Sequence, residues 1–430
     1  MKIENNPPKN QWENLLRRPQ TTVDDLEQTV DDIFDQIQQR GDQAVRKYTE
    51  LFDGVQLDDL SVDEEAIRSA ENNLSNELRS AIDLAYDNIK TFHQAQKRNG
   101  ISVETMPGIE CKMEVRPIER VGLYIPGGTA PLFSSVLMLA IPAQLAGCHE
   151  IVLCTPPNQE KKVHPAMLYA AKKCGVDKIF KLGGIQAVGA MTFGTESVPK
   201  VYKILGPGNR FVTAAKQRAT KYGVSIDMPA GPSELMLAID DSANASYVAA
   251  DALSQAEHGV DSQIVIVSKN KDLLEKVDRE IQQQIQELPR KDIAQKAIEN
   301  SVLIVLEKQQ AILELINAYA PEHLIIATRF NEFLEENIIN AGSVFIGNLA
   351  AESIGDYASG TNHTLPTNGF ARQYSGVNIS SFQKSITFQK IDQQGLQNIG
   401  KAVEQMAEAE DLLAHKKAVS MRLKDLDNNG

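Results

Sequence analysis

This chain of 430 residues contains few cysteines, a single tryptophan and no long apolar run. The cysteines form no C-x-x-C pair, so neither a zinc ribbon nor a disulfide framework is indicated, and reduced, mostly buried thiols are expected. They are Cys111, Cys148, Cys154 and Cys174. The strongest apolar run, 136–143, is much shorter than the roughly 20 residues that a membrane span requires, so no transmembrane segment is expected.

The chain also lacks an excess of positive charge, because its formal net charge is −13. Nucleic acids and anionic membranes bind clustered Lys and Arg, so neither is expected as a partner. Residues 1–19 contain no apolar signal-peptide core, which predicts a cytoplasmic location. The proportions of hydrophobic and charged residues are those of an ordinary folded protein, and the length allows two or three domains.

Hydrophobic periodicity predicts a helical opening over 22–100, with Gly41 and Gly54 ending helices. Its apolar positions recur at spacings of three and four: Val30, Ile33, Phe34 and Ile37. A strand-like stretch follows over 111–124. The turn residues at 125–131 then interrupt the pattern, and a domain boundary is expected there.

From 151 to 346, short apolar strands alternate with helices, which is typical of βαβ order and predicts two open α/β units. The expected strands are 151–154, 178–182, 202–205, 234–239, 263–267, 302–306, 324–327 and 343–346. The expected helices are 165–174, 186–193, 210–222, 244–258, 271–288 and 309–319. The charged tail from 394 onward is predicted to be helical.

Three glycine-bearing loops, 125–128, 182–186 and 205–209, follow strands of the first unit. Glycines there let backbone amides approach a phosphate or a nucleotide. None of the loops matches G-x-G-x-x-G, and each one alone is better explained as an ordinary strand-to-helix turn. Three such loops in one unit favour a ligand crevice at the strand ends.

Two pairs of polar residues in the second half are candidates for chemistry. Gln255 and His258 lie three apart on a predicted helix and share a face, so they could hold one ion; a capped helix end beside Gly259 is an equal alternative. Glu322 and His323 directly precede a predicted strand and supply two possible general bases, the alternative being a loop salt bridge.

Asp356 and His363 flank a loop rich in Gly, Ser, Thr and Asn, which is either a further ligand site or a surface loop. Glu410 and His415 are about 140° apart around a helix axis, so a solvated helix is expected there. No H-E-x-x-H is present, which disfavours a zinc hydrolase of the zincin type. No G-x-S-x-G is present either. The residues alone thus indicate an α/β enzyme with a metal site of His, Asp and Gln ligands.

Seven separated blocks, spread over nearly the whole chain, resemble the histidinol dehydrogenase family in sequence and in order. The blocks are Val121-Gly-Leu-Tyr-Ile-Pro-Gly-Gly128, Gly206-Pro-Gly-Asn209, Asp227-Met-Pro-Ala-Gly-Pro-Ser-Glu234, Ser254-Gln-Ala-Glu-His-Gly259, Ala320-Pro-Glu-His-Leu324, Gly355-Asp-Tyr-Ala-Ser-Gly-Thr-Asn-His-Thr-Leu-Pro366 and Ala414-His-Lys416.

The resemblance implies a homodimer of chains with two incomplete Rossmann-like domains, one inserted in the other, and small helical terminal segments. The domains expected from it are an N-terminal arm (1–20), a first α/β domain with the zinc and substrate site (21–123 plus 233–377), an inserted NAD-binding α/β domain (124–232) and a C-terminal helical segment that crosses to the partner subunit (378–430).

The resemblance also implies which residues form the site. One zinc ion per subunit would be held by Gln255, His258 and Asp356, with His415 of the partner subunit. NAD would contact Tyr124, Gln186 and Asn209. The substrate contacts would be Ser233, Gln255, His258, His323, Asp356, His363, Glu410 and His415.

The implied reaction oxidises L-histidinol through histidinaldehyde to L-histidine with NAD in two steps, the last step of histidine biosynthesis. His323 would accept the substrate's proton at each oxidation, and Glu322 would activate water against the aldehyde. The closest alternative is a related zinc and NAD dehydrogenase that acts on another polar alcohol. A binding protein without turnover would be expected to have lost Glu322, His323 or a zinc ligand, and a zinc hydrolase would not need the NAD loops.

Overall fold

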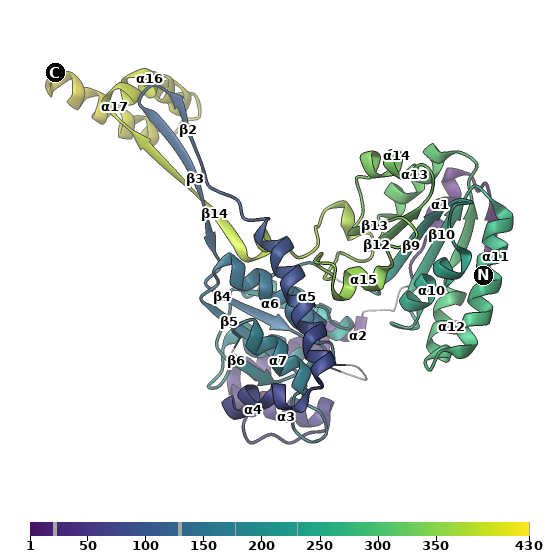
Figure 1. Ribbon diagram of the computed structural model, residues 1–430. Helices are drawn as coiled ribbons and strands as arrows, with labels where there is room; N and C mark the ends of the chain where they lie inside the picture. The colour runs from purple at the N-terminus through teal and green to yellow at the C-terminus, as the bar shows by residue number, and fades with distance from the viewer. Residues whose placement is uncertain (20–23, 128–130, 177, 230, 430) are drawn as a thin grey trace. The chain divides into compact units, whose positions relative to one another are not determined.

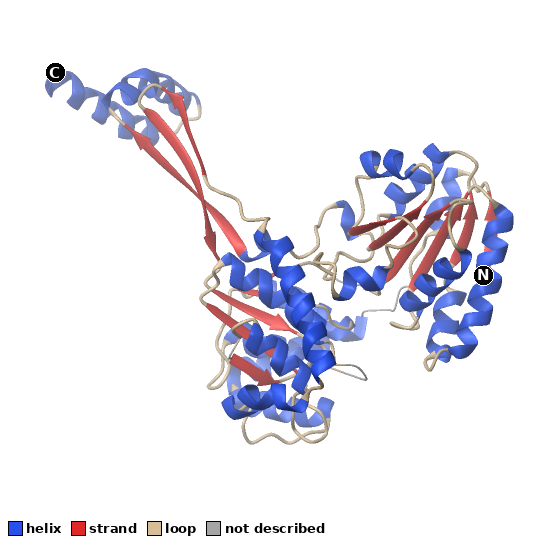
Figure 2. Ribbon diagram, in the orientation of Figure 1, coloured by secondary structure: helices blue, strands red, loops and turns tan. Residues whose placement is uncertain are grey.

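The computed structural model describes all residues except 20–23, 128–130, 177, 230 and 430. The chain forms two units, residues 1–96 with 118–382 and residues 97–117 with 383–430. The first unit contains two parallel sheets, each with helices on both faces (Figures 1 and 2). The α/β class expected from the alternating pattern is thereby confirmed.

The first of these sheets has five strands in the order β6-β5-β4-β7-β8, and every neighbouring pair is parallel. The strands are β4 (Arg120–Tyr124), β5 (Glu150–Thr155), β6 (Lys178–Lys181), β7 (Lys203–Leu205) and β8 (Ser225–Ile226). Expected strands 151–154, 178–182 and 202–205 agree with β5, β6 and β7 to within one residue at each end.

Helices cover both faces of this sheet because its strands alternate between two apolar clusters. Leu123 packs with α5, α6 and α7, whereas Cys154 packs with α2, α3, α8 and α9. The helices are α2 (Asp24–Arg40), α3 (Asp42–Asp53), α4 (Glu64–Ser69), α5 (Asn76–Gln94), α6 (Phe133–Ala146), α7 (Pro165–Lys173), α8 (Gly184–Phe193) and α9 (Arg210–Thr220). The four apolar positions predicted for one face of α2 are all buried in the second cluster, which confirms that periodicity.

The turn at 125–131 follows β4, and β4 pairs with β5 on one side and β7 on the other. Strand pairing thus joins residues 120–124 to the sheet of 150–226, and α2, α3 and α5 pack on the same sheet. The expected first domain instead grouped 21–123 with 233–377. The residues expected to mark a domain boundary thus follow the end of one strand within a sheet. Residues 128–130 of this turn, including the predicted loop glycine Gly128, lie outside the described residues.

The second parallel sheet has six strands in the order β1-β11-β10-β9-β12-β13. They are β1 (Lys2–Asn5), β9 (Glu234–Ile239), β10 (Gln263–Ser268), β11 (Val302–Val305), β12 (His323–Ala327) and β13 (Ser343–Ile346). The expected strands at 234–239 and 343–346 match β9 and β13 at both ends. Within the segment expected to be an N-terminal arm, β1 pairs with β11 at the sheet edge.

Alternate residues of β9 face opposite helical layers. Leu235 and Leu237 pack with α10, α11 and α12, whereas Met236 and Ala238 pack with α1, α13 and α14. The helices are α1 (Lys9–Leu15), α10 (Ala245–Ala256), α11 (Lys271–Gln284), α12 (Lys291–Glu299), α13 (Gln309–Tyr319), α14 (Asn331–Asn337) and α15 (Glu352–Tyr357). All six residues of β9 are buried, as expected for a central strand with both faces covered.

The second unit is an antiparallel sheet in the order β14-β3-β2, followed by two helices. Its elements are β2 (Ile101–Met106), β3 (Ile109–Pro117), β14 (Gln383–Ile391), α16 (Gln393–Ala409) and α17 (Leu413–Asn429). The helical tail is confirmed. The expected segment 378–430 forms one unit with residues 97–117, because β3 pairs with β14 along its whole length. Among the described residues, no helix is both long and apolar enough to cross a bilayer.

One half-buried carboxyl group links two helices beside the five-stranded sheet. Asp53, at the end of α3, accepts a hydrogen bond of 3.0 Å from Nε2 of Gln186 on α8. Burial raises the pKa of Asp53 to about 6, although the hydrogen bond from Gln186 opposes this shift. The ionised carboxylate is therefore less favourable in the folded chain than in the unfolded one.

We expect Asp53→Asn to raise the melting temperature at pH 8 by roughly 2 °C and to leave it unchanged at pH 4. A raised folded pKa means that the wild-type protein loses stability as pH rises from about 4 through 6, whereas asparagine does not ionise and still accepts from Gln186. Thermal denaturation at the two pH values measures the difference. The matched control is Asp58→Asn at an exposed site, and an equal gain at both pH values would contradict the prediction.

Candidate active site

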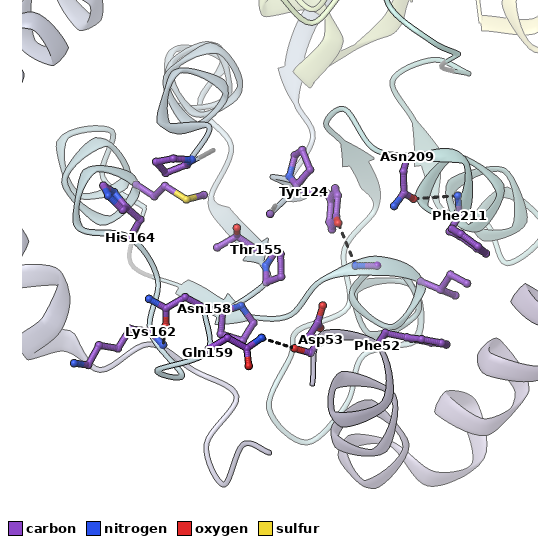
Figure 3. Close-up of a pocket in the computed structure, with 18 of the residues that line it drawn as sticks. Phe52, Asp53, Tyr124, Thr155, Asn158, Gln159, Lys162, His164, Asn209 and Phe211 are labelled. Atoms are coloured by element: carbon purple, nitrogen blue, oxygen red, sulfur yellow. Dashed lines mark hydrogen bonds between the residues drawn. The ribbon is translucent and has the colours of Figure 1, made fainter. Parts of the chain in front are cut away.

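A cavity of about 870 Å³ lies at the carboxyl ends of the five-stranded sheet (Figure 3). Tyr124 is the last residue of β4 and Thr155 the last of β5, while Gly184 and Asn209 come from the loops or helix starts after β6 and β7. Phe52 and Asp53 at the end of α3 complete one side. The glycine loops predicted to form a crevice thus do meet at one cavity.

The position of this cavity is the one that open parallel sheets offer to ligands. From β4 the chain adds β5 and β6 on one side, and then β7 and β8 on the other, so the strand order reverses between β4 and β7. Tyr124 and Asn209 stand on the two sides of this reversal. In such sheets, ligands bind outside the carboxyl ends of the strands at this point.

Tyr124, Gln186 and Asn209 are held by hydrogen bonds from different elements. The hydroxyl oxygen of Tyr124 accepts from the backbone nitrogen of Gly184 at 3.1 Å. The side chain of Gln186 is fully buried, and its Oε1 has no hydrogen-bond partner in the described part of the chain. Oδ1 of Asn209 caps α9 by accepting from two backbone amides of its first turn. Tyr124 and Asn209 line the cavity directly, whereas Gln186 reaches it through Asp53.

A second group of polar residues lies at the amino ends of the six-stranded sheet. Ser233 directly precedes β9, Glu322 precedes β12, and His323 begins β12. All strands of the sheet are parallel, so these residues share one edge. Because α10 runs back between two parallel strands, it delivers Gln255 and His258 to the same edge.

His323 is the centre of this group. Its Nδ1 lies 3.7 Å from Oε2 of Glu322 and 3.8 Å from Oε1 of Glu352, and its Nε2 lies 3.4 Å from Oδ1 of Asp356. These are ion-pair distances without hydrogen-bond geometry, since neither ring nitrogen has a hydrogen-bond partner among the described residues. Oε2 of Glu322 is fixed by the backbone nitrogen of Glu234, at 2.9 Å.

Burial and charge together control the protons of this group. Burial raises the pKa of Glu322 to about 7 and that of Glu352 to about 8, and His323 opposes both shifts. Burial also disfavours a charge on His323, but the surrounding carboxylates, with Glu352 the strongest, outweigh it and raise the pKa of the ring. The imidazole and the carboxylates therefore titrate as one coupled group.

Three side chains offer ligand atoms to one metal ion. Atoms of His258, Glu352 and Asp356 lie within 4.8 Å of one another. Burial lowers the pKa of His258, so its ring is neutral and offers a lone pair. Gln255 is fully buried, yet both its amide oxygen and its amide nitrogen lack a partner among the described residues.

Several buried atoms of this group lack a hydrogen-bond partner among the described residues. They are the strongest indication that the site binds a ligand. Buried polar groups in folded proteins are almost always hydrogen-bonded, and each unpaired one costs about 1–3 kcal/mol. In the described part of the chain, Gln255, His323, Asp356 and Glu352 all carry buried atoms without a hydrogen-bond partner. The donor set of nitrogen and oxygen atoms fits a borderline ion such as zinc together with a polar substrate.

The remaining predicted residues have different surroundings. His363 is half-buried, and both ring nitrogens are engaged: Nδ1 with the backbone oxygen of Asp356 at 2.8 Å and Nε2 with Oγ of Ser135 at 3.0 Å. Glu410 and His415 belong to the second unit, where both are exposed. The structure therefore places the predicted NAD contacts at the five-stranded sheet and the residues around His323 at the six-stranded sheet, whereas Glu410 and His415 belong to the second unit.

Sequence reasoning missed two residues. Glu352 stands four positions before Asp356 on α15, a spacing that places both on one helix face, and this signal was present in the sequence. No sequence pattern marked Asp53, because it lies in a helix far along the chain from the glycine loops with which it lines the cavity.

Comparison with known proteins identifies the family. The family model for histidinol dehydrogenase matches residues 16–423. The histidinol dehydrogenase of Bacteroides thetaiotaomicron is 56% identical over 99% of this chain and its own entire length. That of Shigella dysenteriae is 47% identical over 97% of this chain and 96% of its own.

A solved structure agrees with the sequence comparison. The crystal structure of histidinol dehydrogenase from Elizabethkingia anophelis superimposes with a TM-score of 0.97 at 52% identity, covering 99% of each chain. Since the match extends over the full chain in both sequence and fold, this protein belongs to the histidinol dehydrogenase family.

Proposed function

We propose that this protein oxidises L-histidinol through histidinaldehyde to L-histidine with two molecules of NAD, the last step of histidine biosynthesis. Membership of the family supports the substrate and the use of NAD. The observation that carries the proposal is the group of buried, unpaired donor atoms around His323, because such a group requires a ligand with several polar atoms.

The proposed zinc ligands of this subunit are Gln255, His258 and Asp356. The fourth would be His415 of the partner subunit. When bound, zinc supplies open positions for the imidazole and amino nitrogens of the substrate, and NAD supplies the acceptor for both hydrides. The dinucleotide would contact Tyr124, Gln186 and Asn209 in the cavity of the five-stranded sheet. Ser233, His363 and Glu410 would add contacts to the substrate.

In this reaction, the neutral form of His323 takes the proton of the substrate hydroxyl, since its buried ring nitrogens have no other hydrogen-bond partner among the described residues. The carboxylates beside Nδ1 stabilise the resulting charge on the ring. Glu322, held by the amide of Glu234, then removes a proton from water as it adds to the aldehyde. Once it has released the first proton, His323 accepts a second one at the next oxidation. Burial of both side chains keeps bulk water from the reactive aldehyde.

We also propose that the two parallel sheets are the two incomplete Rossmann-like domains of the family. The strand pairing supports a division into 24–96 with 118–226 for the dinucleotide and 1–19 with 231–377 for the substrate. The cytoplasmic location expected from the sequence stays a prediction.

A homodimer is proposed because the second unit exposes apolar side chains along its strands and helices. They include Ile101, Val103, Phe388, Met406 and Leu413, each more than two fifths exposed. Such apolar surface is typical of a protein interface. His415 is likewise exposed and lies on α17 of the same unit.

The proposed activity is tested by mixing purified protein with L-histidinol, zinc and NAD, and counting the NADH formed. We expect two NADH for each histidinol consumed, loss of activity with a chelator, and recovery with zinc, because the unpaired donors then regain their ligand. Turnover of another polar alcohol in place of histidinol would instead identify a relative with changed specificity. Absence of any NADH would refute the dehydrogenase assignment.

The role of Glu322 is tested by single-turnover kinetics with enzyme in excess. We expect Glu322→Gln to form about one NADH per histidinol at a near-normal rate, and the second NADH at least about a hundredfold more slowly, because the amide cannot take a proton from water. Glu335→Gln, at an exposed site in α14, is the control and should form two NADH per histidinol. Normal formation of the second NADH by Glu322→Gln would exclude the role, and so would loss of the first.

The shared site is tested by subunit mixing. His415→Asn and Gln255→Ala should each be inactive alone, but equal amounts dissociated and reassociated together should recover about a quarter of the wild-type activity, since half of the dimers then contain one intact site. Activity of His415→Asn alone, or no recovery on mixing, would contradict a site completed by the partner subunit.

A further inference from the structure

A buried ion pair lies behind the dinucleotide cavity. Nζ of Lys216 on α9 contacts Oδ1 of Asp227, which directly follows β8, and the two side chains are 3% and 1% exposed. Removing two charges from water costs several kcal/mol per ion, and apolar residues of similar size are often at least as stabilising. A contribution to the free energy of unfolding therefore does not by itself explain this ion pair.

Both charged groups bind the backbone of a single residue. Nζ of Lys216 donates to the backbone oxygen of Gly206 at 2.8 Å, and the backbone nitrogen of Gly206 donates to Oδ2 of Asp227 at 2.8 Å. The ion pair thus holds the peptide groups before and after Gly206 at once. Neither charged side chain lines the cavity itself.

Gly206 in turn sets the position of two cavity residues. Its φ of +133° is rare for residues with a side chain, and a Cβ there would collide with the backbone oxygen of Tyr124. Gly206 therefore packs directly on Tyr124, the last residue of β4. Asn209, three residues further on, caps the same helix that carries Lys216. A shift of Gly206 would displace Tyr124 and Asn209 together.

We propose that Lys216 and Asp227 are positioning residues for the dinucleotide, which fix the loop 205–209 against β4. The inference rests on the proposed binding of NAD in this cavity. A purely structural pair would change the melting temperature and leave NAD affinity unchanged. A positioning pair changes the affinity even where the fold is retained.

The test variant is the double substitution Lys216→Met with Asp227→Asn. It leaves no single buried charge, methionine replaces the lysine stem, and asparagine still offers an oxygen to the amide of Gly206. We expect NAD affinity, measured by calorimetry without histidinol, to fall at least about tenfold, the scale of a small misplacement. Hydrogen exchange at the amides of 206–209 should become faster. The KM for NAD should rise while the KM for histidinol stays the same.

The matched control is Lys178→Met with Glu150→Gln, which removes a more exposed ion pair between neighbouring strands of the same sheet. Its NAD affinity should equal that of the wild type. If the wild type binds NAD and the folded test variant binds it equally well, the inference is overturned and the proposed function stands. Failure of the wild type to bind NAD would overturn both. If the double variant does not fold, Lys216→Leu with Asp227→Asn replaces it, which likewise leaves no single buried charge, and wild-type affinity there would equally overturn the inference.

Discussion

The parallel pairing of β9 with β12 is the constraint on which the candidate active site depends. It places His323 opposite Leu235, so Glu322 reaches the backbone amide of Glu234, next to Ser233. Glu234 is itself buried and held by Arg18, whose guanidinium also donates to the backbone of Tyr319 and lies over its ring. This register thus places the two proposed bases, Glu322 and His323, beside the loop before β9. Through Glu234 and Arg18, it also connects them to the N-terminal segment.

The two parallel sheets present their polar residues at opposite ends. The cavity with Tyr124 and Asn209 lies at the carboxyl ends of one sheet, where helix starts favour a phosphate-bearing ligand. The group around His323 lies at the amino ends of the other, where helix α10 ends. Helix carbonyl ends favour cations, which suits a metal and a protonated imidazole. Each end therefore suits the charge of its proposed ligand.

Much of the local structure could be predicted from the sequence, because strands buried on both faces and glycine-ended helices are local signals. The predicted ranges for β9, α13 and β13 match at both ends. The grouping of elements into sheets could not be predicted, since β1 and β3 pair with strands far along the chain and their own residues do not specify the partner. The roles of the site residues came from a family resemblance. The residues alone gave a signal for Gln255 with His258, for Glu322 with His323, for the loop between Asp356 and His363, and for the glycine loops.

The unpaired donor atoms around His323 have a consequence for how such a sequence changes over generations. Replacing Gln255 or Glu352 with an apolar residue of similar size would remove a desolvation cost, so many substitutions there would make the folded chain more stable. Selection for folding stability alone would therefore replace these polar residues with apolar ones. The polar group persists only where the organism gains from turnover, and a lineage supplied with histidine would be expected to lose it early.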